Sequence, residues 1–442
     1  MKQILPFFLL FLAAADLPAQ VSGFYYELPS LPERVTNNAV TAAWVADTPY
    51  VYSFCGLDST KIWSGIHLKA WRMNLITQHW EQLPSAPDPA GGKIATAAST
   101  VKGRVYLIGG YHVAQNGAES SSAKVHRFDP VANAWLSDGA NLPKPIDDQV
   151  QAVWRDSLIF VITGWSNTGN LPNVQIYNPS ADTWLSGTPV PDNTNYKVFG
   201  ASGIILNDTI YYCGGARQGS AFPATTFFRK GYIDPANPAQ ISWTGFNTPN
   251  AQGYRMAAAA MAGHAVWVGG ANVTYNYNGI AYNGSGGVPA LSRVLDYDKH
   301  NGYLSTMTGD TAFLPAIMDS RGAAQIGREY FVTAGGMEAG QNVSRRVFGY
   351  HWAYLVGVSQ VIDSEPLNIY PNPAGAQVEV ALEGPFSVMV FNMEGKMVLQ
   401  KTGADQLRLE TKALAPGPYL IRIVGGNHKV ITRKMIIGTR SR

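Results

Sequence analysis

A short apolar strand that closes on glycine recurs six times along this chain of 442 residues. The closing glycines are Gly56, Gly110, Gly164, Gly215, Gly270 and Gly336. Successive copies lie 51 to 66 residues apart, a period typical of repeat architectures. Because one small sheet cannot bury both of its own apolar faces, such repeats must pack on one another. The period therefore restricts the fold to a series of similar units.

Each glycine copy is followed by an aromatic turn and then by a large aromatic side chain. Phe128-Asp129-Pro130 and Tyr177-Asn178-Pro179 are two of the turns. The large aromatic residues are Trp80, Trp135, Trp184, Trp243 and Tyr303. Four short strands per repeat account for this spacing, and six four-stranded sheets arranged radially cover one another's faces. The sequence thus predicts an all-β, six-bladed propeller.

The paired glycines, the aromatic–Asp–Pro turn and the spaced tryptophans together resemble the kelch propeller family, over about residues 23–352. We place the kelch-like six-bladed β-propeller at residues 20–356, with an atypical fifth blade that carries an insertion near residues 271–292. The last repeat ends at His351-Trp352 without a fourth strand. Phe24–Pro29 has the pattern of the missing strand, so we expect it to complete the sixth blade and remove an open sheet edge.

The N-terminus has the features of a signal peptide over residues 1–19. Lys2 precedes a short apolar run, and Leu17-Pro18-Ala19 offers a cleavage site. The run is too short to span a bilayer stably, and we find no other transmembrane segment. We therefore expect an exported protein.

The C-terminal part differs from the repeats. After a linker at residues 357–366, alternating strands predict a small antiparallel β-sandwich at residues 367–442. Its motifs resemble the C-terminal sorting domain of type IX secretion (Por), and the matching residues are Tyr370, Pro371, Asn372, Pro373, Gly395, Gly417 and Tyr419. The resemblance implies the type IX secretion machinery as a partner and a secreted or outer cell-surface location.

The composition excludes several functions. With 33 basic and 30 acidic residues, and the basic excess in the tail, the chain lacks the concentrated basic face of a nucleic-acid binder. Its two cysteines, Cys55 and Cys213, rule out a disulfide scaffold and a thiolate zinc cluster. The eight histidines form no closely spaced pairs. We expect no metal and no cofactor.

Five cations precede the first strand of their blades, 15 to 22 residues before the closing glycine: Arg34, Lys93, Lys197, Arg255 and Arg321. Equivalent positions of a radial repeat would surround one mouth of the channel and attract an anionic ligand. The alternative is that each cation pairs with a local carboxylate. Tyr275, Tyr277 and Tyr282 in the insertion suit adaptable recognition, and the alternative is an ordinary long surface loop. Asp147-Asp148 is interpreted as a solvated loop rather than an acid–base pair.

These features favour a binding module for protein or glycan, most simply a monomer, without an assigned catalytic residue. The alternative is a propeller enzyme that acts on an acidic sugar, similar to a sialic-acid mutarotase. Such an enzyme would need a carboxylate or histidine positioned beside the cations. The sequence does not identify one.

Overall fold

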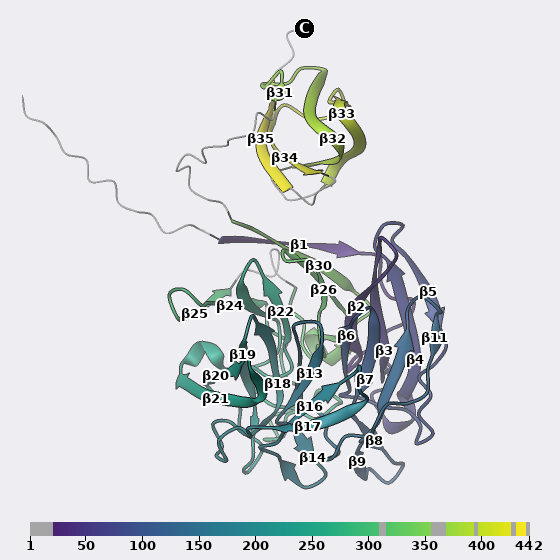
Figure 1. Ribbon diagram of the computed structural model, residues 1–442, viewed down its shortest axis with the longest axis vertical. Helices are drawn as coiled ribbons and strands as arrows, with labels where there is room; N and C mark the ends of the chain where they lie inside the picture. Colours follow the sequence, from purple (N-terminus) through teal and green to yellow (C-terminus); the bar gives the residue numbers. More distant parts are fainter. Residues whose placement is uncertain (1–20, 309–314, 355–367, 393–396, 426–429, 439–442) are drawn as a thin grey trace, which may run out of the picture. The chain divides into compact units, whose positions relative to one another are not determined.

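The computed structural model describes residues 21–308, 315–354, 368–392, 397–425 and 430–438. The chain divides into two compact units, of which one is Tyr25–Trp352 and the other contains the C-terminal strands (Figure 1). The predicted signal peptide and linker lie outside the described residues. No helix of the described part is long and apolar enough to cross a membrane.

The first unit contains six four-stranded antiparallel sheets, as predicted. Each of the first five blades runs outward from an inner strand through three more strands along the chain. The first three blades comprise β2 (Ala39–Val45), β3 (Thr48–Leu57), β4 (Ile66–Asn74) and β5 (His79–Leu83); β6 (Ala97–Val101), β7 (Arg104–Ile108), β10 (Val125–Asp129) and β11 (Ala134–Trp135); and β12 (Val150–Trp154), β13 (Leu158–Ile162), β16 (Val174–Asn178) and β17 (Thr183–Gly187).

The remaining blades follow the same order, except that the sixth takes its outer strand from the N-terminus. They comprise β18 (Val198–Leu206), β19 (Thr209–Arg217), β20 (Phe227–Asp234) and β21 (Asn237–Asn247); β22 (Ala257–Met261), β23 (His264–Val268), β24 (Arg293–Asp298) and β25 (Tyr303–Thr308); and β26 (Ala324–Ile326), β27 (Tyr330–Ala334), β30 (Val347–Tyr354) and β1 (Val21–Leu28). This confirms the predicted ring closure.

Side chains of β1 hold the closure in place. The Tyr26 ring stacks on Tyr330 at a centroid distance of 6.0 Å, and Glu27 accepts two 3.0 Å hydrogen bonds from Arg346. Leu28 is buried in the core cluster between the sixth and first blades. The N-terminal strand therefore supplies apolar burial as well as covering the edge of β30.

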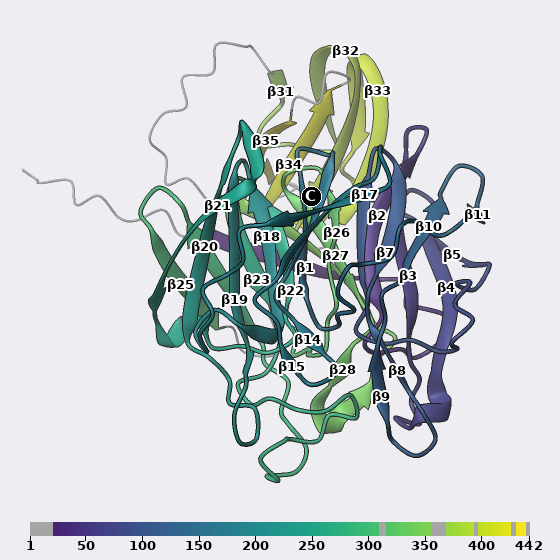
Figure 2. The same cartoon turned by 60° about the horizontal axis from the view of Figure 1, so that its bottom comes forward.

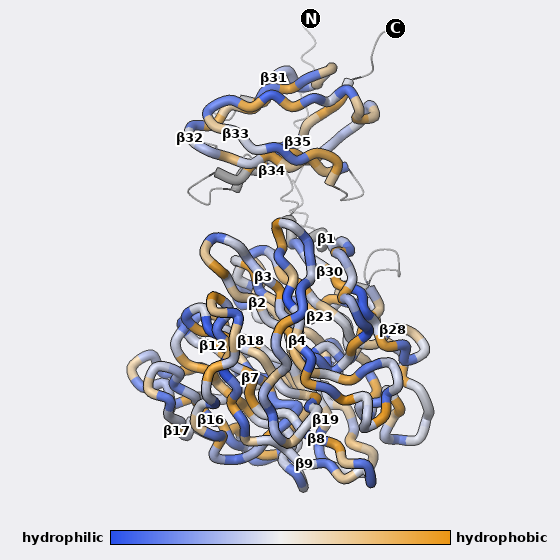
Figure 3. The backbone as a smooth tube through the Cα atoms, turned by 90° about the vertical axis from the view of Figure 1, so that its right-hand side faces the viewer, coloured by the Kyte–Doolittle hydropathy of each residue, from blue (hydrophilic) through white to orange (hydrophobic). Residues whose placement is uncertain are grey.

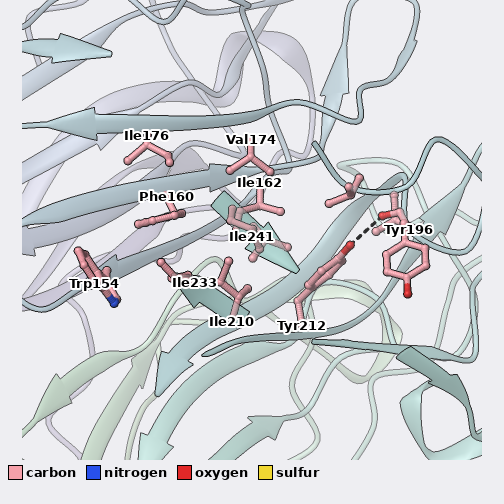
Figure 4. Packing of buried hydrophobic residues seen from close by; sticks show 14 of the residues in the cluster. Trp154, Phe160, Ile162, Val174, Ile176, Tyr196, Ile210, Tyr212, Ile233 and Ile241 are labelled. Carbon is pink, nitrogen blue, oxygen red and sulfur yellow. Dashed lines mark hydrogen bonds between the residues drawn. The ribbon is translucent and has the colours of Figure 1, made fainter. Parts of the chain in front are cut away.

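Neighbouring blades bury aliphatic and aromatic side chains between them. Figure 4 shows the cluster between the third and fourth blades, where Trp154 and Phe160 face Ile210 and Ile233. Burying one such side chain fully contributes about 1.5–3 kcal/mol, so these contacts supply much of the stability of the ring.

The repeated tryptophan also joins neighbouring blades through a hydrogen bond. Its indole N–H donates to a carbonyl oxygen at the end of the preceding blade. The four pairs are Trp80 to Pro29, Trp135 to Pro84, Trp184 to Ala140 and Trp243 to Thr188, at 2.8–3.2 Å. In the fifth blade, Tyr303 occupies the corresponding place and is largely exposed. The tryptophan thus has a structural role in four of the blades.

The second unit is one five-stranded antiparallel sheet that folds over its own core (Figure 3). Its strands are β31 (Asn368–Tyr370), β32 (Gln377–Phe391), β33 (Met397–Glu410), β34 (Gly417–Gly425) and β35 (Val430–Ile437). The pairing of β32 with β33 shifts register between Leu382 and Pro385. Beyond this shift, β32 pairs with β34 instead of β31, which gives the two layers expected for a small sandwich.

Candidate functional site

One end of the propeller carries the loops between the second and third strands of each blade, and we call this end the loop mouth. Three of these loops contain short hairpins, which lie together in the lower part of Figure 2. The hairpins are β8 (Tyr111–Val113) with β9 (Glu119–Ser121), β14 (Trp165–Ser166) with β15 (Gly169–Asn170), and β28 (Met337–Glu338) with β29 (Asn342–Val343).

The chain segments, or junctions, at or just before the starts of the inner strands form a ring at this mouth, which we call the collar. Each junction places one residue in the left-handed region, with φ between 47° and 66°. The six collar residues are Asn37, Ala95, Asp148, Gly200, Arg255 and Asp319. The N–H groups of Asp148, Gly200 and Arg255 each donate to the carbonyl of the preceding collar residue, at 2.8–3.3 Å. The backbone thus brings six side-chain positions together at the axis.

Three charged collar residues form a buried ionic network. The Arg255 guanidinium lies 2.6 Å from the Asp148 carboxylate and 3.0 Å from the Asp319 carboxylate. All three side chains are at most 3% exposed. Arg321 adds a second guanidinium 3.3 Å from Asp148. Burial is the largest single effect on Arg255 and disfavours its charged form. The combined effect of Asp148, Tyr254, Asp319 and Tyr111 outweighs burial and raises the pKa of Arg255 well above its usual value.

Two tyrosine rings and two polar side chains enclose this network. The guanidinium carbon of Arg255 lies 5.1 Å from the ring centroid of Tyr254 and 5.5 Å from that of Tyr275. Thr36 donates a 2.6 Å hydrogen bond to Asp319, which also accepts one from Asn37. Since every charge is paired and covered, the network closes the axis of the ring instead of offering free cations.

A cavity of about 90 Å³ lies on the loop side of this network, and we call it the mouth cavity. Residues from the second to fifth blades line it: Tyr111, Glu119, Asp147, Asp148, Trp165, Phe199, Phe222, Arg255, Asn276 and Tyr282. A separate channel of about 310 Å³ runs between the inner strands, lined mostly by Ala, Ser, Thr and Gly. Arg255 lines only the mouth cavity and Arg321 only the channel.

Aromatic rings form one corner of the mouth cavity. The centroids of Trp165, Phe199 and Phe222 are 5.5 Å from one another, with interplanar angles of 62° to 90°. Tyr282 packs edge-on against Phe222 at 5.0 Å. Edge-to-face contacts of this kind fix the ring orientations, because the positive edge of one ring meets the negative face of the next.

The carboxylates of the cavity lie on the second and third blades. Asp147 is 4% exposed and accepts a 2.5 Å hydrogen bond from the Ser121 hydroxyl, whereas Glu119 is exposed. Burial and the neighbouring Asp148 charge raise the pKa of Asp147 well above its usual value. The prediction that Asp147-Asp148 forms a solvated loop is therefore wrong, because packing around the ring buries this junction.

The insertion of the fifth blade reaches across the mouth. Thr274 donates a 2.7 Å hydrogen bond to the Phe222 carbonyl in the fourth blade, and Gln341 in the sixth blade donates one of 2.6 Å to Val288. Tyr277 packs against an apolar cluster of the first and second blades that includes Tyr111. The insertion therefore contacts the loops on both sides and contributes Asn276 and Tyr282 to the cavity.

The structure brings three of the predicted ligand-binding residues together, since Arg255, Arg321 and Tyr275 belong to the ionic network or its cover. Lys93 is buried against Asp88, 2.5 Å away, with His126 at 3.0 Å. Lys197 pairs with the exposed Asp192.

Arg34 is exposed and donates to the Val343 carbonyl at 2.8 Å. It lines a surface cleft with Lys61 and Glu338, away from the residues of the mouth cavity. Of the five predicted cations, only Arg255 occupies a collar position. The other four fall two or three residues before or after one, so their side chains do not form a single ring.

The sequence alone did not identify Trp165, Phe199, Phe222 and Glu119 as site residues, whereas Tyr282 belongs to the insertion that was interpreted as a recognition loop. Tyr111 and Trp165 directly follow the closing glycines of their blades, a fixed position that could have identified them. Phe222 and Glu119 lie at irregular distances within loops of different length and carry no such signal. Among the described residues, no group of three or more His, Cys, Asp or Glu side chains is arranged to hold a metal ion.

The sorting-motif residues lie around the last strand of the second unit. Asn372 donates to the Lys434 carbonyl at 3.0 Å and accepts from the Ile436 N–H at 2.9 Å, which ties it to β35. Tyr419 is buried and donates to Ala415, and Gly417 begins β34 with a φ of 145°. Tyr370, Pro371 and Pro373 are exposed, whereas Gly395 lies outside the described residues.

The fold and the repeated blade contacts define a radial β-repeat protein with a separate C-terminal sheet. Residues 95–137 match the Kelch motif, and residues 368–438 match the secretion system C-terminal sorting domain. The chain thus combines a kelch-repeat β-propeller with a secretion sorting domain, which confirms both resemblances.

Several curated proteins are similar to part of the propeller. Kelch-like protein 36 of Bos taurus is 25% identical over 113 residues, covering 26% of this chain and 17% of that protein. Kelch-like protein 23 of Homo sapiens is 28% identical over 126 residues (28% and 21%), and Kelch-like protein 15 of Homo sapiens 27% over 166 residues (37% and 24%). The matches span about a quarter or less of these relatives.

Among solved structures, that of YjhT superposes with a TM-score of 0.57 at 15% sequence identity. The superposition covers 72% of this chain and 95% of that chain. At this identity the similarity concerns the fold alone.

Proposed function

We propose that this protein is exported by the type IX route and acts, secreted or on the cell surface, as a recognition module. Its ligand, a protein segment or a glycan, binds at the loop mouth of the propeller. The observation that carries the proposal is the mouth cavity, to which four blades and the insertion contribute side chains. Concave sites that combine apolar walls with a few polar groups are the usual form of binding sites.

The lining of the cavity supports recognition. Trp165, Phe222 and Tyr282 are only partly buried, so they offer ring surface to a ligand. Asp147 and Asn276 provide hydrogen-bonding groups next to them. Rigid aromatic contacts combined with a few polar groups give affinity at a small cost in conformational entropy.

Binding can be tested with the full chain on arrays of glycans and peptides. We expect a ligand whose binding falls at least tenfold in Trp165→Ala, because the variant loses a whole wall of the cavity. Trp63→Ala is the matched control, since Trp63 is an exposed aromatic in the corresponding loop of the first blade. Binding that is equal in both variants, or no ligand on either array, would contradict a site in the mouth cavity.

A catalytic role is the second candidate, favoured by one observation. Asp147 is a buried carboxyl with a raised pKa beside Asp148, which is paired with Arg255, and a buried carboxyl of this kind can serve as a general acid. No observation favours an acidic sugar as the substrate. Arg255 and Arg321 already pair with carboxylates of the protein, so they are not available to bind the carboxylate of a sugar. Turnover of a screened sugar that disappears in Asp147→Asn while binding persists would replace the binding role with an enzymatic one.

The export route has its own test. A chain that lacks residues 368–442 should remain inside the outer membrane, because the sorting domain lies within this segment. Immunoblots of the medium and of surface-labelled cells measure delivery. A full-length chain with Trp63→Ala is the control, and it should reach the surface because it keeps the sorting domain. If the truncated chain reached the surface as well as the intact one, the sorting role would be refuted.

A further inference from the structure

Half of the residues that line the mouth cavity are aromatic. They are Tyr111, Trp165, Phe199, Phe222 and Tyr282. The face of an aromatic ring carries negative electrostatic potential, so an array of rings around a small space attracts a cation. The edge-to-face packing of Trp165, Phe199 and Phe222 holds these walls in place without a ligand.

The formal charges of the side chains that line the cavity also favour a cationic ligand. Arg255 is the only basic side chain among the described lining residues, and it is bound to Asp148 and Asp319. Two carboxyl groups remain, Asp147 and Glu119, and no described lining residue offers a second cation. An anionic ligand would meet these carboxyl groups directly, whereas a cation would be stabilised by them.

The size of the cavity limits the ligand to a compact group. Its volume of about 90 Å³ corresponds to roughly three water molecules, at about 30 Å³ each. A few heavy atoms fill this space. The network around Arg255 closes the inner end, so the rest of a larger ligand would have to extend toward the loops.

We propose that the mouth cavity binds a substituted ammonium group. The rings of Trp165, Phe222 and Tyr282 contact its methyl or methylene groups. The Glu119 carboxylate balances its charge, and Asp147 adds to this when the bound cation displaces its proton. This inference rests on the proposed recognition function and specifies its chemistry. The group belongs either to a free quaternary amine or to a methylated lysine side chain on a protein, which share the same cationic head.

Calorimetric titration of the full chain with choline tests the inference. The comparison ligand is 3,3-dimethyl-1-butanol, which has the same shape without the charge. We expect choline to bind at least tenfold more tightly, since desolvated cation–π contacts and a carboxylate act only on the charged head. Equal affinity for the two compounds would overturn the inference.

Substitutions localise the binding. Trp165→Ala should weaken choline binding at least tenfold, while Trp165→Phe, which keeps an aromatic face, should retain most of it. Glu119→Gln should weaken it several-fold, and Asp147→Asn by less, because the folded protein holds a proton on Asp147 that the bound cation must first displace. Trp63→Ala is the control and should bind as the unaltered chain does. Near-ultraviolet circular dichroism checks that each variant is folded. An unchanged affinity in folded Trp165→Ala would place choline elsewhere and overturn the inference.

The two sources of the ammonium group, and the two proposals, can be told apart. A peptide with trimethyl-lysine that binds more tightly than both choline and the unmodified peptide identifies a protein ligand, and the reverse order identifies a free amine. If choline and the modified peptide both fail while another ligand binds and is lost in Trp165→Ala, the ammonium inference falls and the recognition function stands. If no ligand depends on Trp165, both fall.

Discussion

Arg255 illustrates how one side chain can look like a ligand-binding cation in sequence and serve the fold in the structure. Its guanidinium is 1% exposed and contacts two carboxylates from different blades, Asp148 in the third and Asp319 in the sixth. A buried charge is tolerated only when it is paired, because desolvation costs several kcal/mol for each ion. Arg255 therefore joins distant blades across the axis of the ring.

This role predicts a large effect on stability. Arg255→Met removes the guanidinium that pairs with the buried Asp148 and Asp319 carboxylates. The free energy of unfolding should therefore fall by about 3–5 kcal/mol. Urea titration followed by tryptophan fluorescence measures the change. Arg34→Met is the control, since Arg34 is exposed and its loss should cost at most about 0.5 kcal/mol. Equal stability of the two variants would show that the network does not support the ring.

Asp147 predicts a pH dependence of stability. Its pKa is raised in the folded protein, mainly by burial and then by Asp148, so the folded state holds a proton that the unfolded state releases near pH 4. The stability that this group contributes is complete below about pH 4 and is lost as the pH rises toward the folded pKa. Asp147→Asn should therefore be more stable than the unaltered chain at pH 7.

Urea titrations between pH 4 and pH 8 measure this difference. It should grow with pH and become small near pH 4, where the unfolded side chain is already about half protonated. Asp192→Asn is the control, because Asp192 is exposed and pairs with Lys197 at the surface. A gap between the two chains that did not change with pH would contradict a raised pKa for Asp147.

At the scale of the strands, the glycine pair that ends the second strand in four of the six blades marks a close approach between blades. Gly109 and Gly110 both have positive φ, and Gly110 donates a 3.0 Å hydrogen bond to the Ile146 carbonyl of the next junction. A Cβ atom on Gly109 would lie 2.3 Å from the same oxygen. Cys55 and Thr163 take the corresponding place in the first and third blades, also at positive φ. Glycine is therefore required only where the neighbouring carbonyl is this close.

Two glycines with similar backbone allow this to be tested. Gly103→Ala, at φ 75° in an open turn, should cost about 1–2 kcal/mol for the left-handed conformation alone. Gly109→Ala, at φ 67°, carries the same cost and should lose about 1–3 kcal/mol more through the clash. Thermal unfolding of both variants measures the difference. Equal losses would mean that the junction moves aside without cost.

The same elements show which parts of the structure were predictable. The spacing of the closing glycines predicted the blades, and the lone strand pattern at Phe24–Pro29 predicted the closure, because both depend on local strand pattern and on the need to cover an edge. In the tail, the alternating patterns at residues 378–382 and 387–392 each predict a strand. The structure joins them in the single long β32, since a register shift bends this strand without ending it.

The site was less predictable, because its residues converge only when the ring closes. Trp165, Phe199 and Phe222 come from loops or junctions of different length in the third and fourth blades. Their distance from the closing glycine placed Lys93 and Lys197 in the predicted ring. In the structure the collar positions of these blades are Ala95 and Gly200, two or three residues later. Local periodicity identifies strands, but junction length decides which side chain reaches the axis.

At the scale of the whole molecule, the propeller depends on its N-terminal strand. Without β1 the sixth blade would end at β30, with an open row of backbone groups and with the apolar contacts of Leu28 removed. An exposed strand edge invites pairing between chains. The ring is thus held by a segment more than 300 residues away in sequence from its partner, as the Glu27–Arg346 pair shows.

A chain that begins at Ser30 should therefore have a lower melting temperature and form oligomers that grow with concentration, relative to a chain that begins at Gln20. Scanning calorimetry and size-exclusion chromatography with light scattering measure the two effects. A peptide of residues 21–28 added in trans should restore both, because it can fill the vacant edge of β30. The same peptide in reversed order is the control. If the shortened chain melted like the longer one and stayed monomeric, β1 would be dispensable and closure of the ring would rest on contacts between the blades alone.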